Sequence, residues 1–97
     1  MIRIETPKIS TFLLEEFMNP HNLSVYRLAK EINVPTSHIQ DILHDKQQIT
    51  ADTSIRLGRF FNVSDRFFLN LQNDIDLRNL KEEKQSEYNK IVPMPLG

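Results

Sequence analysis

The 97-residue sequence contains no cysteine, only two glycines and no apolar run close to the roughly 20 residues that cross a bilayer. The lack of cysteine excludes disulfide bonds and thiolate chemistry and is compatible with a reducing cytoplasm, where we expect the chain to act. The N-terminal stretch MIRIETPKIS has no apolar segment before a small-residue cleavage site, so neither export nor a membrane partner is expected. Few glycines beside many Leu, Ile, Lys and Glu residues predict an all-α fold.

The formal net charge is −1, with 26% charged and 39% hydrophobic residues. This charge argues against a strongly basic, histone-like nucleic-acid binder. It leaves room for a small module that binds DNA through a few well-placed donors and doubles its contacts by dimerising. The length predicts one domain with a modest core, which a second copy or a partner would stabilise.

Apolar periodicity predicts five helices, over residues 11–19, 25–32, 35–44, 51–61 and 65–78. The predicted N-caps of the second, fourth and fifth helices are Ser24, Thr50 and Ser64. We expect NPHN to end the first helix, because Pro20 disfavours helical backbone at Asn19.

Residues 1–78 are predicted to form the domain. The segment 79–97 is highly charged at first and then contains two prolines. We interpret it as a C-terminal tail, either flexible or ordered by a partner.

The segment NVPTSHIQ (33–40) interrupts what could be one long helix. Before it, apolar residues at 25, 28, 29 and 32 share one helical face. Asn33 tolerates the left-handed conformation of a tight turn, and Pro35 suits the first position of a new helix. Residues 24–44 therefore match a helix-turn-helix motif, whose second helix can enter the major groove of DNA. The alternative is structural, because any small helical protein contains such helix pairs.

Exposed polar residues of this motif are the candidate DNA contacts. They lie on the second helix, in the loop after it and at the start of the first helix: Thr36, Ser37, His38, Gln40 and Asp41; Lys46, Gln47 and Gln48; Ser24, Tyr26 and Arg27. Gln40 has the chemistry to pair with adenine, and Asp41 to accept from the cytosine amino group or to reject wrong bases. The loop side chains and the free N–H groups of the helix starts suit phosphate.

Three stretches together resemble one family: LLEEFM (13–18), LSVYRLAKEINVPTSHIQDILHDKQQITADTSIRLGRFF (23–61) and FFLNLQNDIDLR (67–78). They are similar to the HigA-type antitoxins, a branch of the lambda-repressor-like helix-turn-helix proteins with a five-helix domain. The resemblance implies a homodimeric antitoxin that neutralises a HigB-like mRNA endonuclease toxin and represses its own operon at a palindromic double-stranded DNA operator. By position, the recognition helix maps to 35–44, with Thr36, Ser37, Gln40 and Asp41 nearest the bases.

The chain departs from the family pattern at three places. KIST (8–11) stands where many relatives have His-Pro-Gly-Glu, Asn33 replaces a glycine between the motif helices, and the loop DKQQ has one fewer positive charge. The last change puts phosphate affinity in doubt. Two rival hypotheses remain: a stand-alone helix-turn-helix regulator without a toxin, and a protein-interaction module that has lost DNA binding.

The remaining groups of polar residues predict neither a metal site nor a catalytic site. His38 and His44 are six residues apart and share no helix face, and with His21 and no cysteine they do not predict a metal site. No Gly-rich phosphate loop or Ser/His/Asp order is present, so neither catalysis nor a cofactor is expected.

Four phenylalanines fall within nine residues, at 60, 61, 67 and 68. Most are expected in the core. The remainder, with neighbouring leucines, form the predicted dimer surface: Phe67, Phe68, Leu69 and Leu71. A symmetric contact there would place two recognition helices about 34 Å apart, one turn of B-DNA.

Overall fold

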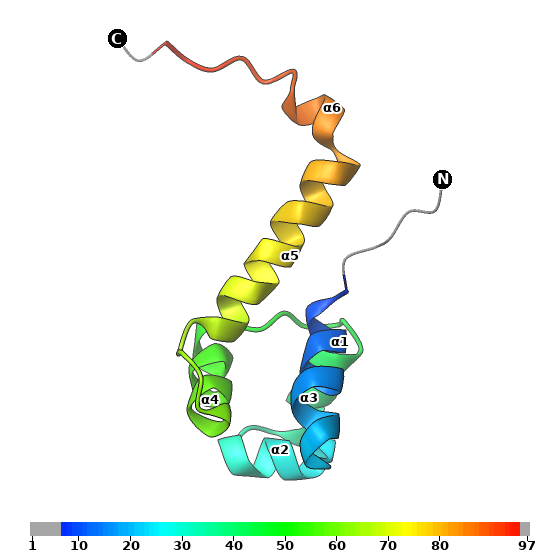
Figure 1. The fold of residues 1–97 in the computed structure, drawn as a ribbon, viewed down its shortest axis with the longest axis vertical. Coiled ribbons are helices and arrows are strands. Elements are labelled where there is room, and N and C mark those ends of the chain that lie inside the picture. The colour runs from blue at the N-terminus through cyan, green and yellow to red at the C-terminus, as the bar shows by residue number, and fades with distance from the viewer. Residues whose placement is uncertain (1–6, 96–97) are drawn as a thin grey trace.

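The computed structural model describes residues 7–95, and within this range the ordered elements are all helical, which confirms the all-α prediction (Figure 1). The elements in chain order are α1 (Ile9–Phe12), a π-helical stretch (Leu13–Met18), a 3-10 turn (Asn19–His21), α2 (Val25–Ile32), α3 (Thr36–Leu43), α4 (Ala51–Phe61), α5 (Phe67–Glu83) and α6 (Gln85–Tyr88). In this part of the chain no helix is both long and apolar enough to cross a bilayer.

Several helices of this glycine-poor chain end at an asparagine or aspartate in the left-handed conformation. Among residues 7–95, the non-glycine residues with positive φ are Asn22, Asn33, Asp45 and Asn62, all with φ between 54° and 60°. At Asn33 the turn is a Schellman motif: the Val34 N–H donates to the Ala29 carbonyl at 3.0 Å, and the Asn33 N–H to the Lys30 carbonyl at 3.2 Å. Asn and Asp tolerate this backbone better than other residues with a side chain, so the predicted left-handed turn at Asn33 is confirmed.

Two of the three predicted N-caps are confirmed. Ser24 Oγ accepts from the Arg27 N–H at 3.0 Å, and Thr50 Oγ1 accepts from the Thr53 N–H at 3.2 Å. Pro35 lies one position earlier than predicted, at the N-cap of α3.

The third predicted N-cap was wrong. Ser64 lies in a turn, where its carbonyl accepts from the Phe67 N–H, and α5 begins two residues later than predicted. The first turn of α5 is instead satisfied from α4, because the Leu69 N–H donates to Ser54 Oγ at 3.1 Å. The Ser54 side chain, fifteen residues before Leu69, therefore takes the place of a local N-cap.

The first and the fifth predicted helices are longer in the structure than predicted. The first starts at Ile9 and continues through Pro20 to His21, because a proline in the first turn of a 3-10 helix needs no N–H acceptor. At the other end α5 runs past residue 78 to Glu83, and α6 follows within the predicted tail. In Figure 1 the second half of α5 and α6 extend away from the body formed by α1 to α4.

The core lies between α1, α2, α3, α4 and the first half of α5. Its buried apolar residues are Leu13, Met18, Leu28, Ala29, Ile32, Ile39, Ile42, Ile49, Leu57 and Phe68. The ring of Phe17, in the π-helical stretch, packs edge-on against rings of α4 and α5. Its centroid lies 4.8 Å from that of Phe68 and 5.1 Å from that of Phe61. The placement of Phe68 in the predicted dimer surface was wrong: its exposed fraction is 0%, since it fills the centre of this aromatic cluster.

Close backbone packing explains the glycine inside α4. A Cβ added at Gly58 would lie 2.6 Å from the Ser64 carbonyl oxygen, and the Gly58 carbonyl accepts from the Val63 N–H at 2.9 Å. The turn between α4 and α5 therefore lies directly on α4, which keeps α5 against the body.

Candidate nucleic-acid interface

One face of α3 is buried and the opposite face is open to solvent. Ile39 and Ile42 are fully buried in the core, where α3 packs against α2 and α1. Ser37, Gln40 and His44 are exposed and lie at the i, i+3 and i+7 spacing of one helical stripe. This stripe presents a hydroxyl, an amide and an imidazole with few aliphatic neighbours, which suits hydrogen bonding to base edges.

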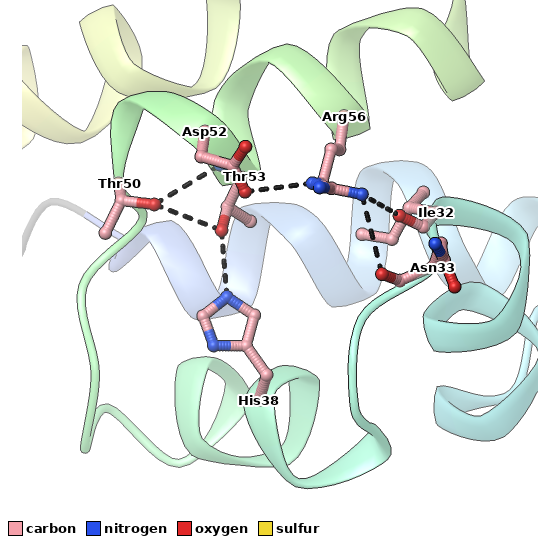
Figure 2. Close-up of polar contacts among 7 residues, drawn as sticks. All are labelled: Ile32, Asn33, His38, Thr50, Asp52, Thr53 and Arg56. Carbon is pink, nitrogen blue, oxygen red and sulfur yellow. Dashed lines mark hydrogen bonds and ion pairs between the residues drawn. The ribbon is translucent and has the colours of Figure 1, made fainter.

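Residues on the flanks of this stripe are only partly accessible. Thr36 and Asp41 are half-buried, as is His38. The prediction that His38 is exposed was wrong, because its ring turns toward α4, where Nε2 lies 2.8 Å from Thr53 Oγ1 (Figure 2). The other ring nitrogen, Nδ1, lies 3.1 Å from Gln47 Oε1. Both ring nitrogens thus have partners within the chain. The same contact holds the Gln47 side chain against α3.

The loop after α3 winds back onto the end of that helix. The Asp41 carbonyl accepts from the Lys46 N–H at 2.8 Å and from the Gln47 N–H at 3.2 Å, while Asp45 takes the left-handed position. The Asp45 carboxylate is held by α1, accepting from Ser10 Oγ at 2.7 Å. These contacts fix the loop backbone close beside the exposed stripe of α3.

The loop presents two long polar side chains to solvent. Lys46 and Gln48 are exposed, and Lys46 has no ion-pair partner among residues 7–95. The neighbouring carboxylate of Asp45 is partly neutralised by Lys8, whose Nζ lies 3.6 Å away. Lys46 therefore carries the positive charge of this surface that is most readily available to a phosphate.

The start of α2 presents the third group of predicted contacts. Ser24, Tyr26 and Arg27 are all exposed, and Tyr26 keeps 66% of its surface accessible. Arg27 Nε lies 3.0 Å from Glu31 Oε1, so this guanidinium carries less free charge than Lys46. The Ser24 oxygen is used as the N-cap, which leaves its hydroxyl proton free to donate.

The backbone at the start of α3 adds two donors. Pro35 supplies no side-chain cap, and the first intrahelical acceptor is its carbonyl, which receives the His38 N–H at 3.0 Å. The N–H groups of Thr36 and Ser37 precede this bond and point out of the helix start, where the helix dipole is positive. Such N–H groups bind phosphate oxygens.

Sequence reasoning missed two residues of α4 that contact the motif. Thr53 is buried and bonds His38, and Arg56 donates from Nη1 to the Ile32 carbonyl at 2.9 Å (Figure 2). Thr53 lies four residues before the buried Leu57, so a polar side chain on an apolar stripe was the signal that it needs a partner. For Arg56 the sequence carries no comparable signal.

Comparison with known proteins agrees with this geometry. Residues 14–68, more than half of the chain, match the family described as Helix-turn-helix. The chain belongs to the lambda-repressor-like helix-turn-helix family. The matched segment includes α2, the left-handed turn at Asn33, α3 and α4, which are the elements that build the surface described above.

Three relatives of this helix-turn-helix chain are informative. It is 40% identical to Virulence-associated protein I of Dichelobacter nodosus over 82 residues, covering 84% of this chain and 75% of that protein. It superimposes with a TM-score of 0.80 and 29% identity on Pseudomonas aeruginosa antitoxin HigA, solved with the higBA promoter, covering 92% and 98% of the two chains. A HigA-family antidote protein from Coxiella burnetii gives a TM-score of 0.82 and 29% identity, over 94% of this chain and 100% of that chain.

Proposed function

We propose that this chain is the antitoxin of a toxin–antitoxin pair and represses its own operon, acting in the cytoplasm as a homodimer on palindromic operator DNA. The observation that supports it most is the structural match with an antitoxin solved with promoter DNA, which extends over 92% of this chain. The absence of a strong positive charge is compatible with this role, because base edges are read by hydrogen bonds rather than by net charge.

In this proposal α3 enters the major groove with its N-terminal end foremost. Thr36 and Ser37, at the first turn, donate or accept at base edges or phosphate, and Gln40 pairs with adenine through its amide. Asp41 accepts from cytosine or disfavours bases that present an acceptor. Lys46 and the N–H groups at the helix starts bind phosphates and set the register of the motif on the duplex.

The proposed homodimer uses the apolar residues of α5 that the core leaves partly or fully open. Once Phe68 is removed from the predicted set, Phe67 remains 37% exposed, and Leu69 and Leu71 are half-buried. Farther along the same helix, Leu77 and Leu80 are 55% and 40% exposed. A second copy packed against α5 would bury leucines that the body formed by α1 to α4 leaves open, and would pair two recognition helices for two half-sites.

The proposed toxin is an mRNA endonuclease of the HigB-like class, encoded beside this chain. Binding of this toxin is what would distinguish an antitoxin from a regulator that only binds DNA. A stand-alone regulator of the same fold would bind promoter DNA and leave the activity of the neighbouring gene product unchanged.

Two measurements test the proposed function. In a band-shift titration the chain should bind its own promoter, and this binding should weaken steeply as the salt concentration rises. Scrambled DNA should compete poorly with the promoter for the chain. RNA cleavage by the neighbouring gene product should stop when the chain is added in equal amount. Promoter binding with undiminished cleavage by a confirmed toxin would support the stand-alone regulator instead, and no salt-dependent promoter binding would support the interaction module.

A further inference from the structure

The recognition helix is short, and only two of its side chains, Ile39 and Ile42, are fully buried in the core. Apolar contacts are non-directional, whereas hydrogen bonds constrain both distance and angle. The polar contacts that reach α3 and the turn before it therefore add directional constraints to the orientation of its exposed stripe.

The first of these contacts connects the start of α4 to the middle of α3. Thr53 Oγ1 accepts from Thr50 Oγ1 at 3.2 Å and lies 2.8 Å from His38 Nε2. The other ring nitrogen of His38, Nδ1, lies 3.1 Å from Gln47 Oε1, an amide oxygen that can only accept. Thr53 is 1% exposed, so the residue that contacts both Thr50 and His38 is itself fixed in the buried interior (Figure 2).

The second contact connects the middle of α4 to the turn of the motif. Arg56 Nη1 donates to the Ile32 carbonyl at 2.9 Å and lies 3.5 Å from the Asn33 carbonyl. These carbonyls belong to the C-terminal end of α2, where the helix dipole is negative and no intrahelical donor remains. Asp52 orients the guanidinium through a 2.9 Å contact to Nε.

We propose that α4 aims the recognition helix through these two contacts, and that Thr53, His38 and Arg56 are positioning residues for sequence recognition. This inference rests on the proposed DNA-binding function. It assigns His38 a different role from the base contact predicted from sequence, because both of its ring nitrogens are used inside the chain.

A small rotation of α3 would suffice to impair recognition. Side-chain tips lie roughly 5–6 Å from a helix axis, so a rotation of about 10° moves them by about 1 Å. A base-edge hydrogen bond tolerates only a few tenths of an ångström around its 2.7–3.2 Å range. Phosphate contacts made by flexible side chains such as Lys46 adapt more easily. Loss of the α4 contacts should therefore reduce sequence preference more than total affinity.

The decisive variant is Thr53→Val, which keeps the shape of the side chain and removes its hydroxyl. We expect the ratio of operator to scrambled-DNA affinity to fall about tenfold, the loss of roughly one good base contact, with the salt slope unchanged. Thr53→Ser restores the hydroxyl and should restore the ratio. Thermal unfolding by circular dichroism, measured on the same samples, shows that both variants are folded.

Two matched pairs complete the test. His38→Ala should lower the ratio as Thr53→Val does, and the double variant should lose no more than either single one, because both remove the same contact. His21→Ala, in the 3-10 turn, is the histidine control. Arg56→Gln should also lower the ratio, and Arg66→Gln, at the exposed N-cap of α5, should not.

Amide hydrogen exchange without DNA gives an independent measure of the same contacts. Amides of α3 should exchange faster in Thr53→Val than in Thr53→Ser. A Thr53→Val variant that keeps its operator preference, or a His38→Ala variant that alters preference at a single base pair only, would overturn the positioning role while leaving the proposed function intact. A wild-type chain without operator preference would overturn both.

Discussion

Replacing Gln72 by leucine tests how firmly α5 holds the segment that follows α3. Gln72 is 4% exposed and lies on the buried stripe of α5 between Phe68 and Ile75. Its amide pairs with both backbone groups of one residue: Oε1 accepts from the Ile49 N–H at 2.7 Å, and Nε2 donates to the Ile49 carbonyl at 2.9 Å. Leucine fills a similar volume and can make neither bond.

The expected loss follows from the two groups left unpaired. Each buried N–H or carbonyl without a partner costs about 1–3 kcal/mol. The added apolar burial of leucine offsets about 1 kcal/mol, so we expect the free energy of unfolding to fall by about 1–5 kcal/mol. A domain of this size is stable by only about 5–15 kcal/mol, and the midpoint of thermal unfolding should fall by roughly 5–40 °C.

Urea unfolding followed by far-ultraviolet circular dichroism measures this change. The midpoint should fall while the slope with urea stays constant, since the surface exposed on unfolding is the same. Gln85→Leu, at an exposed position of α6, is the control and should leave stability within about 0.5 kcal/mol. Each protein is measured at several concentrations, because dimerisation adds to apparent stability. A Gln72→Leu chain as stable as the control would refute the assignment of this amide as a support of the loop.

Further predictions concern the turn, the packing of α4, phosphate binding and pH. Asn33→Ala should lower the free energy of unfolding by about 1 kcal/mol in urea titrations, because alanine tolerates positive φ less well. Gly58→Ala should lower it by about 1–3 kcal/mol, since the new Cβ would lie 2.6 Å from a backbone oxygen. Lys46→Ala should weaken operator and scrambled DNA alike in band shifts and reduce the salt slope by about 0.9; a changed preference at one base would contradict this. The Arg59 guanidinium holds the pKa of Asp65 below its ordinary value, so the small stabilisation by this pair should be complete above about pH 4. It should be lost as pH falls through the lowered pKa, which carboxyl NMR titration locates.

Recognition of the motif from sequence succeeded where the signals are local. The N-caps at Ser24 and Thr50 and the left-handed turn at Asn33 depend on residues within a few positions along the chain. The start of α5 was misplaced for the opposite reason: its first turn is satisfied by Ser54, and Ser64 takes part in a turn instead. A cap supplied from another helix leaves no local pattern.

Within the candidate interface the same distinction holds. Ser37 and Gln40 are exposed because they lie opposite the buried Ile39 and Ile42, which a helical projection of the sequence predicts. His38 lies at the boundary between the two faces, where a projection cannot decide its direction. Its orientation depends on a hydroxyl fifteen residues away.

The sequence by itself determined that the chain is helical, that a tight left-handed turn separates two short helices and that the second of these has a polar face. Periodicity, capping chemistry and backbone preference act over a few residues, so these features are visible in order along the chain. Only the tertiary structure decided that His38, at the boundary of that polar face, is held by α4. It also buried Phe68 and left the far half of α5 open. Those outcomes depend on contacts between distant segments, whose geometry is settled when the core packs.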